Sequence, residues 1–123
     1  MIGIGTDLVD IDRFREVLTR TPGIRTRLFC DAELAYADTS GDPARPLAAR
    51  FAAKEAFLKS LKSGLGAVRF SEVEVVRHDD GHPELVLHGE AAVFARSKGA
   101  RRFEISLTHT DTLAQAVVAA LPE

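Results

Sequence analysis

The chain of 123 residues has one cysteine, no tryptophan, one tyrosine and one methionine. Its single thiol, Cys30, makes no disulfide within the chain and leaves no pair of thiolates for a zinc site. No apolar run approaches the roughly 18 residues that a membrane-spanning helix needs. The first residues carry no basic segment ahead of an apolar one, so we expect no signal peptide and a cytoplasmic protein.

The chain also lacks an excess of charge of either sign. Sixteen lysines and arginines stand against 18 aspartates and glutamates, which gives a net charge of −2. This balance and the scarcity of aromatic residues argue against a nucleic-acid-binding module. Hydrophobic residues make up 46% and charged residues 28%, a composition typical of a folded globular chain. At this length we predict one domain over residues 1–123.

The spacing of apolar residues predicts an α+β domain, in which one long helix packs on a small, mainly antiparallel sheet. Helices are expected at 11–20, 31–37, 46–62 and 90–98. Strands are expected at 2–9, 71–77, 84–88, 103–108 and 114–118. Asp10 or Asp12 is expected to cap the first helix and Asp31 the second. Residues 39–46 contain Gly41 and two prolines, and we expect a loop there.

The long helix carries charged residues where apolar ones are expected. Its buried stripe is predicted to consist of Leu47, Phe51, Leu58 and Leu61. Lys54 falls within this stripe, and Glu55 and Lys59 lie at its edge. One interpretation is that Lys54 extends its charge past its neighbours to solvent, while Glu55 and Lys59 form a surface pair. The other is that the three side chains belong to a binding site, because a buried lysine is costly unless it is paired.

The same helix is rich in alanine, at positions 48, 49, 52, 53 and 56. These small side chains allow a ligand or another backbone to come close. Alanine is also the best helix former, and this property alone explains its abundance without a ligand.

Three further features are candidates for a site, each with a structural alternative. Asp7 ends a glycine-bearing strand, where it either holds a cation or acts as an acid near the start of the next helix. His109 follows a strand and is either structural or functional. Gly64 either closes the long helix or, with Gly66, lets backbone N–H groups approach a phosphate.

Four short motifs follow one another along the chain in the order found in a known family. They are Gly3-Ile4-Gly5-Thr6-Asp7-Leu8-Val9-Asp10, Arg50-Phe51-Ala52-Ala53-Lys54-Glu55-Ala56-Phe57-Leu58-Lys59, Gly64-Leu65-Gly66 and Ser106-Leu107-Thr108-His109-Thr110. Together they resemble the opening motif, central signature, glycine loop and final motif of the holo-[acyl-carrier-protein] synthases. The resemblance covers essentially the whole chain. It departs at Asp10, where a glutamate is usual, and in the Asp42 to Pro46 loop, which has two prolines where basic residues are common.

The resemblance implies a 4′-phosphopantetheinyl transferase. Such an enzyme moves phosphopantetheine from coenzyme A to a serine hydroxyl of an apo acyl carrier protein. It requires Mg²⁺ and releases adenosine 3′,5′-bisphosphate. The resemblance also implies a homotrimer with each active site at a subunit interface. The carrier belongs to fatty-acid, polyketide or peptide synthesis, alternatives that the residues do not separate.

The resemblance also assigns roles to individual residues. Asp7 and Glu55 are expected to hold Mg²⁺, a cation that prefers oxygen ligands, and Lys59 is expected to face the phosphates. Glu55 is also a candidate for the base that takes the serine proton. Lys54 is expected to hold the Glu55 carboxylate or to contact the phosphates. Further ligand-binding candidates are Arg50 and His109 for the nucleotide 3′-phosphate, from the neighbouring subunit, and Gly64 and Gly66 as a backbone cradle.

A basic surface is expected to dock the carrier, because carrier proteins of this type are acidic helical bundles. Arg13 and Arg20 are seven residues apart and share one face of the first helix. The alternative is an ordinary solvated face. The residues are also compatible with two other functions. One is a non-catalytic trimer of the same fold that binds nucleotide or carrier, and the other is a metal-dependent phosphohydrolase.

Overall fold

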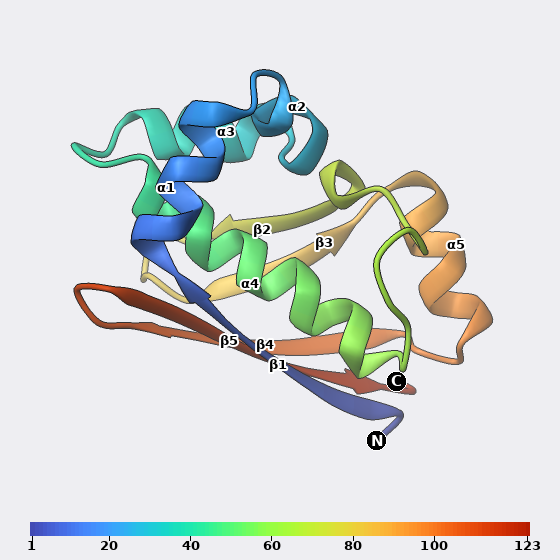
Figure 1. The fold of residues 1–123 in the computed structure, drawn as a ribbon. Helices are drawn as coiled ribbons and strands as arrows, with labels where there is room; N and C mark the ends of the chain where they lie inside the picture. The colour runs from blue at the N-terminus through green and yellow to red at the C-terminus, as the bar shows by residue number, and fades with distance from the viewer.

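The computed structural model describes residues 1–123 as a helical layer packed on two antiparallel sheets (Figure 1). In chain order its elements are β1 (Gly3–Asp10), α1 (Ile11–Arg20), α2 (Ile24–Leu28), α3 (Asp31–Asp38), α4 (Ala44–Ser60), the 3-10 helix η1 (Phe70–Glu72), β2 (Val73–Arg77), β3 (Pro83–Leu87), α5 (Gly89–Ser97), β4 (Arg102–His109) and β5 (Leu113–Leu121). No helix has both the length and the apolar character needed to cross a membrane. The expected α+β architecture, with a long helix on a small antiparallel sheet, is confirmed.

Two sheets underlie the helices. The larger sheet has the strand order β1-β5-β4, and β2 and β3 form a separate pair. Asp7 of β1 and Leu107 of β4 both lie opposite Ala116 of the central strand β5. Helix α4 crosses the inner face of the larger sheet, and no helix covers the outer face (Figure 1).

Helix α4 and strand β1 approach each other unusually closely. A Cβ atom at Gly5 would lie 2.0 Å from the Ala56 carbonyl oxygen, and one at Gly3 would lie 2.2 Å from the Ser60 carbonyl oxygen. Only glycine fits at such distances. The interpretation that the alanine-rich helix admits a second backbone is therefore confirmed, and the backbone is that of β1.

The boundaries of α4 differ from expectation at both ends. The helix begins at Ala44, because Pro43 precedes it and Pro46 lies in its first turn, where no backbone N–H is needed. It ends at Ser60, and the residue with positive φ beyond it is Lys62 (φ 58°). The reading of Gly64 as the helix-closing residue is therefore wrong.

One short helix was not predicted, and one expected capping residue is wrong. Helix α2 has no buried residue, so it shows no apolar periodicity by which to predict it. Helix α3 begins after Cys30 rather than after a capping Asp31, because the Glu33 carboxylate accepts a hydrogen bond from the Cys30 N–H (3.1 Å). Asp10 does cap α1, accepting from the Arg13 N–H at 3.0 Å.

Candidate active site

A carboxylate pair lies where β1 meets α4. Along β1 the burial alternates, so Gly5, Asp7 and Val9 face the helix while Leu8 faces outward. Asp7 thereby faces Glu55 of α4. The two acids line one open groove of about 400 Å³, whose wall is completed by α1. Asp7 and Glu55, expected to act together, are thus brought together by the fold.

The Glu55 carboxyl is half-buried and lies near a like charge. Burial raises the pKa of Glu55, the negative charge of Asp7 raises it further, and Lys59 opposes both effects. Lys59 Nζ donates to the Asp7 carboxylate at 3.2 Å and to the Thr6 carbonyl at 3.0 Å. The alternative of a surface pair between Glu55 and Lys59 is therefore wrong, because Lys59 reaches across to the strand.

Two carboxylates that face each other are suited to a divalent cation, which relieves their repulsion. Magnesium commonly takes one or two protein carboxylates and completes its shell with water and substrate phosphates. Asp7 and Glu55 fit that pattern. No cluster of three or more His, Cys, Asp or Glu side chains is placed to bind a metal ion.

Lys54 lies outside this site, contrary to expectation. Its side chain is fully buried, and Nζ donates to Glu33 Oε1 and to the Phe70 carbonyl oxygen, both at 2.7 Å. It lies 5.1 Å from the centre of the Phe29 ring. The expectations that Lys54 reaches solvent, holds the Glu55 carboxylate or contacts phosphates are wrong. Its charge is matched inside the core by Glu33, which the sequence did not single out.

A second cavity, of about 500 Å³, collects positive charge. It opens between α4, the end of β4 and the β2–β3 hairpin, and it is lined by Arg45, Arg50, Arg77 and His109. No aspartate or glutamate lines it. Arg50 and His109, expected to share a ligand, therefore do share a cavity. Arg45 and Arg77 were missed, because one lies in a stretch expected to be a loop and the other lies where a strand ends.

Arg50 has an unmet bonding requirement in this cavity. Only 5% of the residue is exposed, its Cζ lies 4.5 Å from the centre of the Tyr36 ring, and Nη1 donates to the Pro46 carbonyl at 3.3 Å. Its Nε is buried without any hydrogen-bond partner. Burial lowers the pKa of the Arg50 guanidinium. An unpartnered donor in a cavity without carboxylates indicates an anionic ligand.

The acid groove and the cationic cavity lie on different faces of α4. No residue lines both of them. Arg50 and Glu55 are five positions apart, which places their side chains about 140° apart around the helix. A single chain therefore does not bring the acid groove and the cationic cavity into one site.

Gly64 and Gly66 line neither the acid groove nor the cationic cavity. Gly66 lines a third cavity, of about 400 Å³, with Arg27 and Arg69. A Cβ at Gly64 or Gly66 would meet no atom within 4 Å, so packing does not require glycine at either position, although Gly66 has a φ of +94°. Their expected role as a phosphate cradle stays a prediction.

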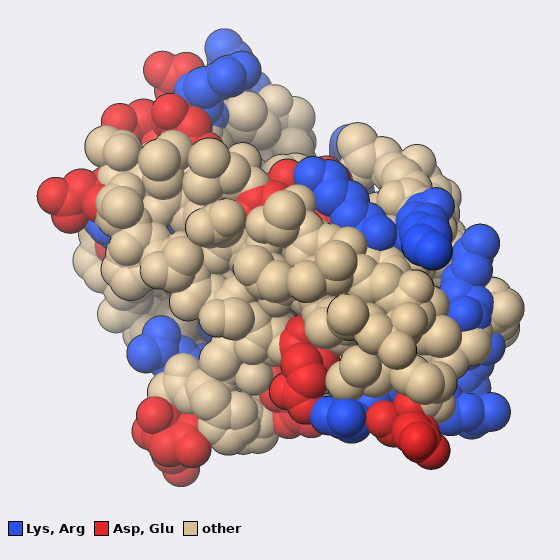
Figure 2. Space-filling model, turned by 90° about the horizontal axis from the view of Figure 1, so that it is seen from below, with Lys and Arg blue, Asp and Glu red and all other residues tan.

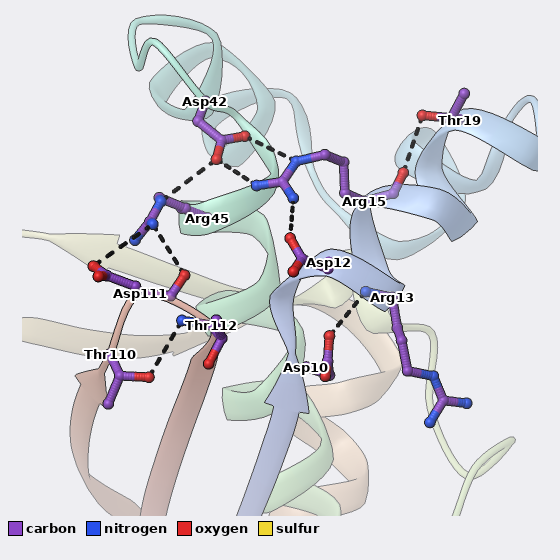
Figure 3. Close-up of polar contacts among 10 residues, drawn as sticks. All are labelled: Asp10, Asp12, Arg13, Arg15, Thr19, Asp42, Arg45, Thr110, Asp111 and Thr112. Carbon is purple, nitrogen blue, oxygen red and sulfur yellow. Dashed lines mark hydrogen bonds and ion pairs between the residues drawn. The ribbon is translucent and has the colours of Figure 1, made fainter.

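The expected basic face on α1 is exposed. Arg13 lines the acid groove, and Figure 3 shows its side chain extending away from Asp10 without contact to the other residues drawn. Arg20 is exposed at the end of the same helix. Both guanidinium groups are free of ion pairs. By contrast, Arg15 on this helix is bound by Asp12 (2.6 Å) and Asp42 (2.5 Å).

The chain is similar in sequence and in fold to known proteins. Residues 3–117 match the 4′-phosphopantetheinyl transferase superfamily. The chain is 44% identical over 116 residues to the holo-[acyl-carrier-protein] synthase of Clavibacter michiganensis subsp. michiganensis, which covers 94% of this chain and 92% of that protein. The fold is similar to the crystal structure of the Neisseria meningitidis holo-[acyl-carrier-protein] synthase, with a TM-score of 0.90, 30% identity and 98% of both chains covered.

Several similar structures were solved with a ligand, one of them from Bacillus anthracis. The holo-(acyl-carrier-protein) synthase of Bacillus anthracis in complex with CoA (3′,5′-ADP) gives a TM-score of 0.80 at 28% identity, over 97% of this chain and 95% of that one. The chain belongs to the 4′-phosphopantetheinyl transferase superfamily and, within it, to the holo-[acyl-carrier-protein] synthases. It is therefore an enzyme of phosphopantetheinyl transfer, and the family resemblance of its motifs is confirmed.

Proposed function

We propose that the chain transfers 4′-phosphopantetheine from coenzyme A to a serine hydroxyl of an apo acyl carrier protein, with Mg²⁺, and releases adenosine 3′,5′-bisphosphate. The observation that carries the proposal is the pairing of two features in one small fold. One is the carboxylate pair Asp7 and Glu55. The other is a cavity lined by arginines and free of acids, in which Arg50 Nε lacks a partner. The ligand of the Bacillus anthracis relative supports a coenzyme A nucleotide as the anion.

In this reaction the serine oxygen bonds to the phosphorus that carries pantetheine. The bond from that phosphorus to the nucleotide's 5′-phosphate breaks, and the serine proton passes to a base. Asp7 and Glu55 would hold Mg²⁺, which when bound neutralises charge on the pyrophosphate. Lys59, whose Nζ lies beside Asp7, is placed to donate to the same phosphate oxygens. The Glu55 carboxylate is our candidate for the base.

The nucleotide is proposed to occupy the cationic cavity, with Arg50 and His109 on its 3′-phosphate. The acid groove and this cavity lie on different faces of α4, so the bound coenzyme A must extend between them from one chain to another. We therefore propose the homotrimer that the family resemblance implies, in which neighbouring chains complete each site. Ile4 and Leu8, on the outer face of β1, are 62% and 59% exposed, and the middle of this sheet face is uncharged (Figure 2). Such a surface is suited to burial between subunits.

The carrier is proposed to dock on α1. The acid groove has an apolar floor that includes Phe14, Val17 and Phe51, and Arg13 lies at its edge. Arg20 extends the positive face along the helix. An acidic helix lying there would bring a serine to the groove of Asp7, because groove and basic face share α1.

The proposal is tested by incubating the full chain with coenzyme A, Mg²⁺ and an apo acyl carrier protein, followed by intact mass measurement of the carrier. We expect a gain of one phosphopantetheine, abolished by chelation of the metal and by Asp7→Ala. The exposed Asp31→Ala serves as the control that keeps activity. Free phosphopantetheine without carrier modification would indicate a hydrolase, and coenzyme A binding without any reaction would indicate a non-catalytic binder. Either result overturns the proposal.

A further inference from the structure

The buried ion pair of Glu33 and Lys54 holds four elements of the fold together. Oε1 of Glu33, in α3, accepts from Lys54 Nζ of α4 at 2.7 Å, and both side chains are fully buried. Oε2 of Glu33 accepts from the Val75 N–H of β2 at 3.0 Å. Lys54 Nζ also donates to the Phe70 carbonyl of η1 at 2.7 Å. Two side chains therefore tie α3, β2 and η1 to the long helix.

A second contact between α3 and α4 lies one helical turn away. Arg50 precedes Lys54 by four positions and Tyr36 follows Glu33 by three, so each two residues share one face of their helix. The Arg50 Cζ lies 4.5 Å from the centre of the Tyr36 ring. The two helices are thus joined by an inner contact, between Lys54 and Glu33, and by an outer one at the cationic cavity.

The elements that Glu33 holds form walls of the cationic cavity. Tyr36 of α3 lines the cavity, and so do Val75 and Arg77 of β2. Glu33 and Lys54 are buried and line no part of it. The pair therefore contacts the framework of the cavity and not its interior.

Arg50 does not hold these walls by hydrogen bonds of its own. Its Nη1 donates to the Pro46 carbonyl within α4, and its Nε has no partner. Burial lowers the pKa of Arg50, and the negative charge of Glu33 is the strongest influence in the opposite direction. Glu33 is thus the acid that stabilises the charges of both Arg50 and Lys54.

A need for stability does not by itself explain the buried pair. Apolar residues of similar volume often replace such a pair without loss of stability, because no charge then has to leave water. Apolar residues fill the same space, but they neither accept from a backbone N–H of β2 nor donate to the carbonyl of η1. The pair adds a fixed geometry, because each hydrogen bond has a preferred length and direction.

We propose that Glu33 is a positioning residue for coenzyme A binding. Through Lys54 and Val75 it holds α3 and β2 at a fixed spacing from α4, and this spacing sets the width of the cationic cavity. Glu33 itself touches no ligand. The inference rests on the proposed function, because it takes coenzyme A as the occupant of the cavity. Neither α3 nor β2 lines the acid groove, so the carrier side of the reaction is independent of Glu33.

The test replaces the pair by apolar side chains in the double variant Glu33→Leu with Lys54→Met. Calorimetry with the full chain and Mg²⁺ measures the dissociation constant of coenzyme A, and steady-state kinetics measures the KM of each substrate. We expect coenzyme A to bind about tenfold more weakly, because the displaced walls no longer orient the ligand. The KM for the carrier should stay within about twofold. Exchange of the Val75 amide hydrogen should become faster, because its acceptor is gone.

Phe103→Ala is the control for lost stability. The Phe103 ring, at the start of β4 and outside α3 and β2, has its centre 5.1 Å from that of the Phe57 ring. Its removal should lower the midpoint of urea denaturation. Coenzyme A binding by this variant should stay within about twofold of wild type.

A second double variant covers the case in which Glu33→Leu with Lys54→Met does not fold. Glu33→Gln with Lys54→Met also removes both charges, but the glutamine amide oxygen still accepts from the Val75 N–H. It should show a smaller loss of binding, again for coenzyme A alone.

Three results would overturn the positioning role. One is coenzyme A binding by the double variant within about twofold of wild type. Another is an equal weakening in Phe103→Ala, because the loss would then follow stability. The third is an equal rise in the KM of both substrates.

Carrier modification by the wild type is measured in parallel. A wild type that modifies the carrier while any of these results is found leaves the proposed function intact and removes only this inference. A wild type that binds no coenzyme A removes the proposed function, and this inference with it.

Discussion

Lys59 Nζ lies 3.2 Å from Asp7 Oδ1, so a helix lysine is paired with a strand carboxylate 52 positions away rather than with Glu55 on its own helix. This contact joins α4 to β1 at the groove where the two acids meet. The proposed catalytic group is therefore assembled by packing of two elements, and it depends on how closely their backbones approach.

Glu55 should be indispensable to transfer. Glu55→Gln removes a carboxylate charge from the proposed magnesium site and removes the candidate base. We expect carrier modification at saturating Mg²⁺ to slow by about a hundredfold or more. The measurement is the initial rate of carrier modification by intact mass. Glu90→Gln, an exposed glutamate of α5, should keep the wild-type rate, and near-normal turnover by Glu55→Gln would refute this role.

The close approach of β1 to α4 predicts a specific sensitivity at Gly5. A Cβ there would lie 2.0 Å from the Ala56 carbonyl oxygen, so the strand must shift away from the helix. We expect Gly5→Ala to lower the free energy of unfolding by about 2 kcal/mol or more in urea denaturation. Gly41→Ala is the matched control, because a Cβ at Gly41 meets nothing within 4 Å. Equal stability of the two variants would contradict the packing described.

Much of the fold follows from sequence patterns that act locally. Apolar spacing and a capping Asp10 predicted α1 over its full length. The strands at the chain's two ends were predicted within a few residues, the first from its apolar run and the last from its alternation. Helix α2 has no buried residue and so no pattern to find.

The residues of the candidate site were likewise predicted only in part. The motif resemblance identified Asp7 and Glu55, but periodicity alone carries no information on which strand faces which helix. Lys54 falls in the predicted apolar stripe, but neither its complete burial nor its partner was predicted. Glu33 lies in α3, whose residues show little amphipathic pattern, so only the tertiary fold brings it to Lys54. Arg45 likewise reaches its cavity through tertiary packing.

The Lys54–Glu33 pair predicts strong coupling in the core. Both side chains are fully buried, and Glu33 also accepts from the Val75 N–H at 3.0 Å. Glu33→Gln leaves the Lys54 ammonium without a counter-charge, which should cost about 3 kcal/mol in urea denaturation. Adding Lys54→Met should recover part of that loss, because the uncompensated charge is removed.

An exposed ion pair provides the control for this cycle. Arg25 binds Asp38 at 2.7 Å on the surface, and Asp38→Asn should cost less than about 1 kcal/mol. Strictly additive losses in the Glu33 and Lys54 double-mutant cycle would show that the two side chains do not interact.

Charge on α1 should govern carrier binding alone. Arg13→Glu and Arg20→Glu place negative charge where an acidic helix is proposed to dock. We expect each to raise the KM for carrier several-fold, with a stronger dependence on salt, and to leave the KM for coenzyme A unchanged. Steady-state kinetics with each substrate varied measures this. Arg101→Glu, outside this face, should act as wild type, and equal effects on both substrates would count against the docking face.

The ion pair between Arg15 and Asp42 predicts a defined acid sensitivity. Hydrogen bonding by Arg15 lowers the pKa of Asp42 in the folded chain, and partial burial opposes this only in part. A carboxyl whose pKa is lower in the folded than in the unfolded state stabilises the fold above its unfolded pKa, near about 3.9. That contribution is lost as the pH falls through the folded pKa.

We therefore expect wild type to lose more stability than Asp42→Asn between about pH 5 and pH 2, so that their free energies of unfolding converge at acid pH. Urea denaturation at a series of pH values measures the difference, in which every other titrating group cancels. Parallel curves for Asp42→Asn would mean that Arg15 contributes no pH-dependent stability through Asp42, and that the carboxylate is held in place by the loop itself.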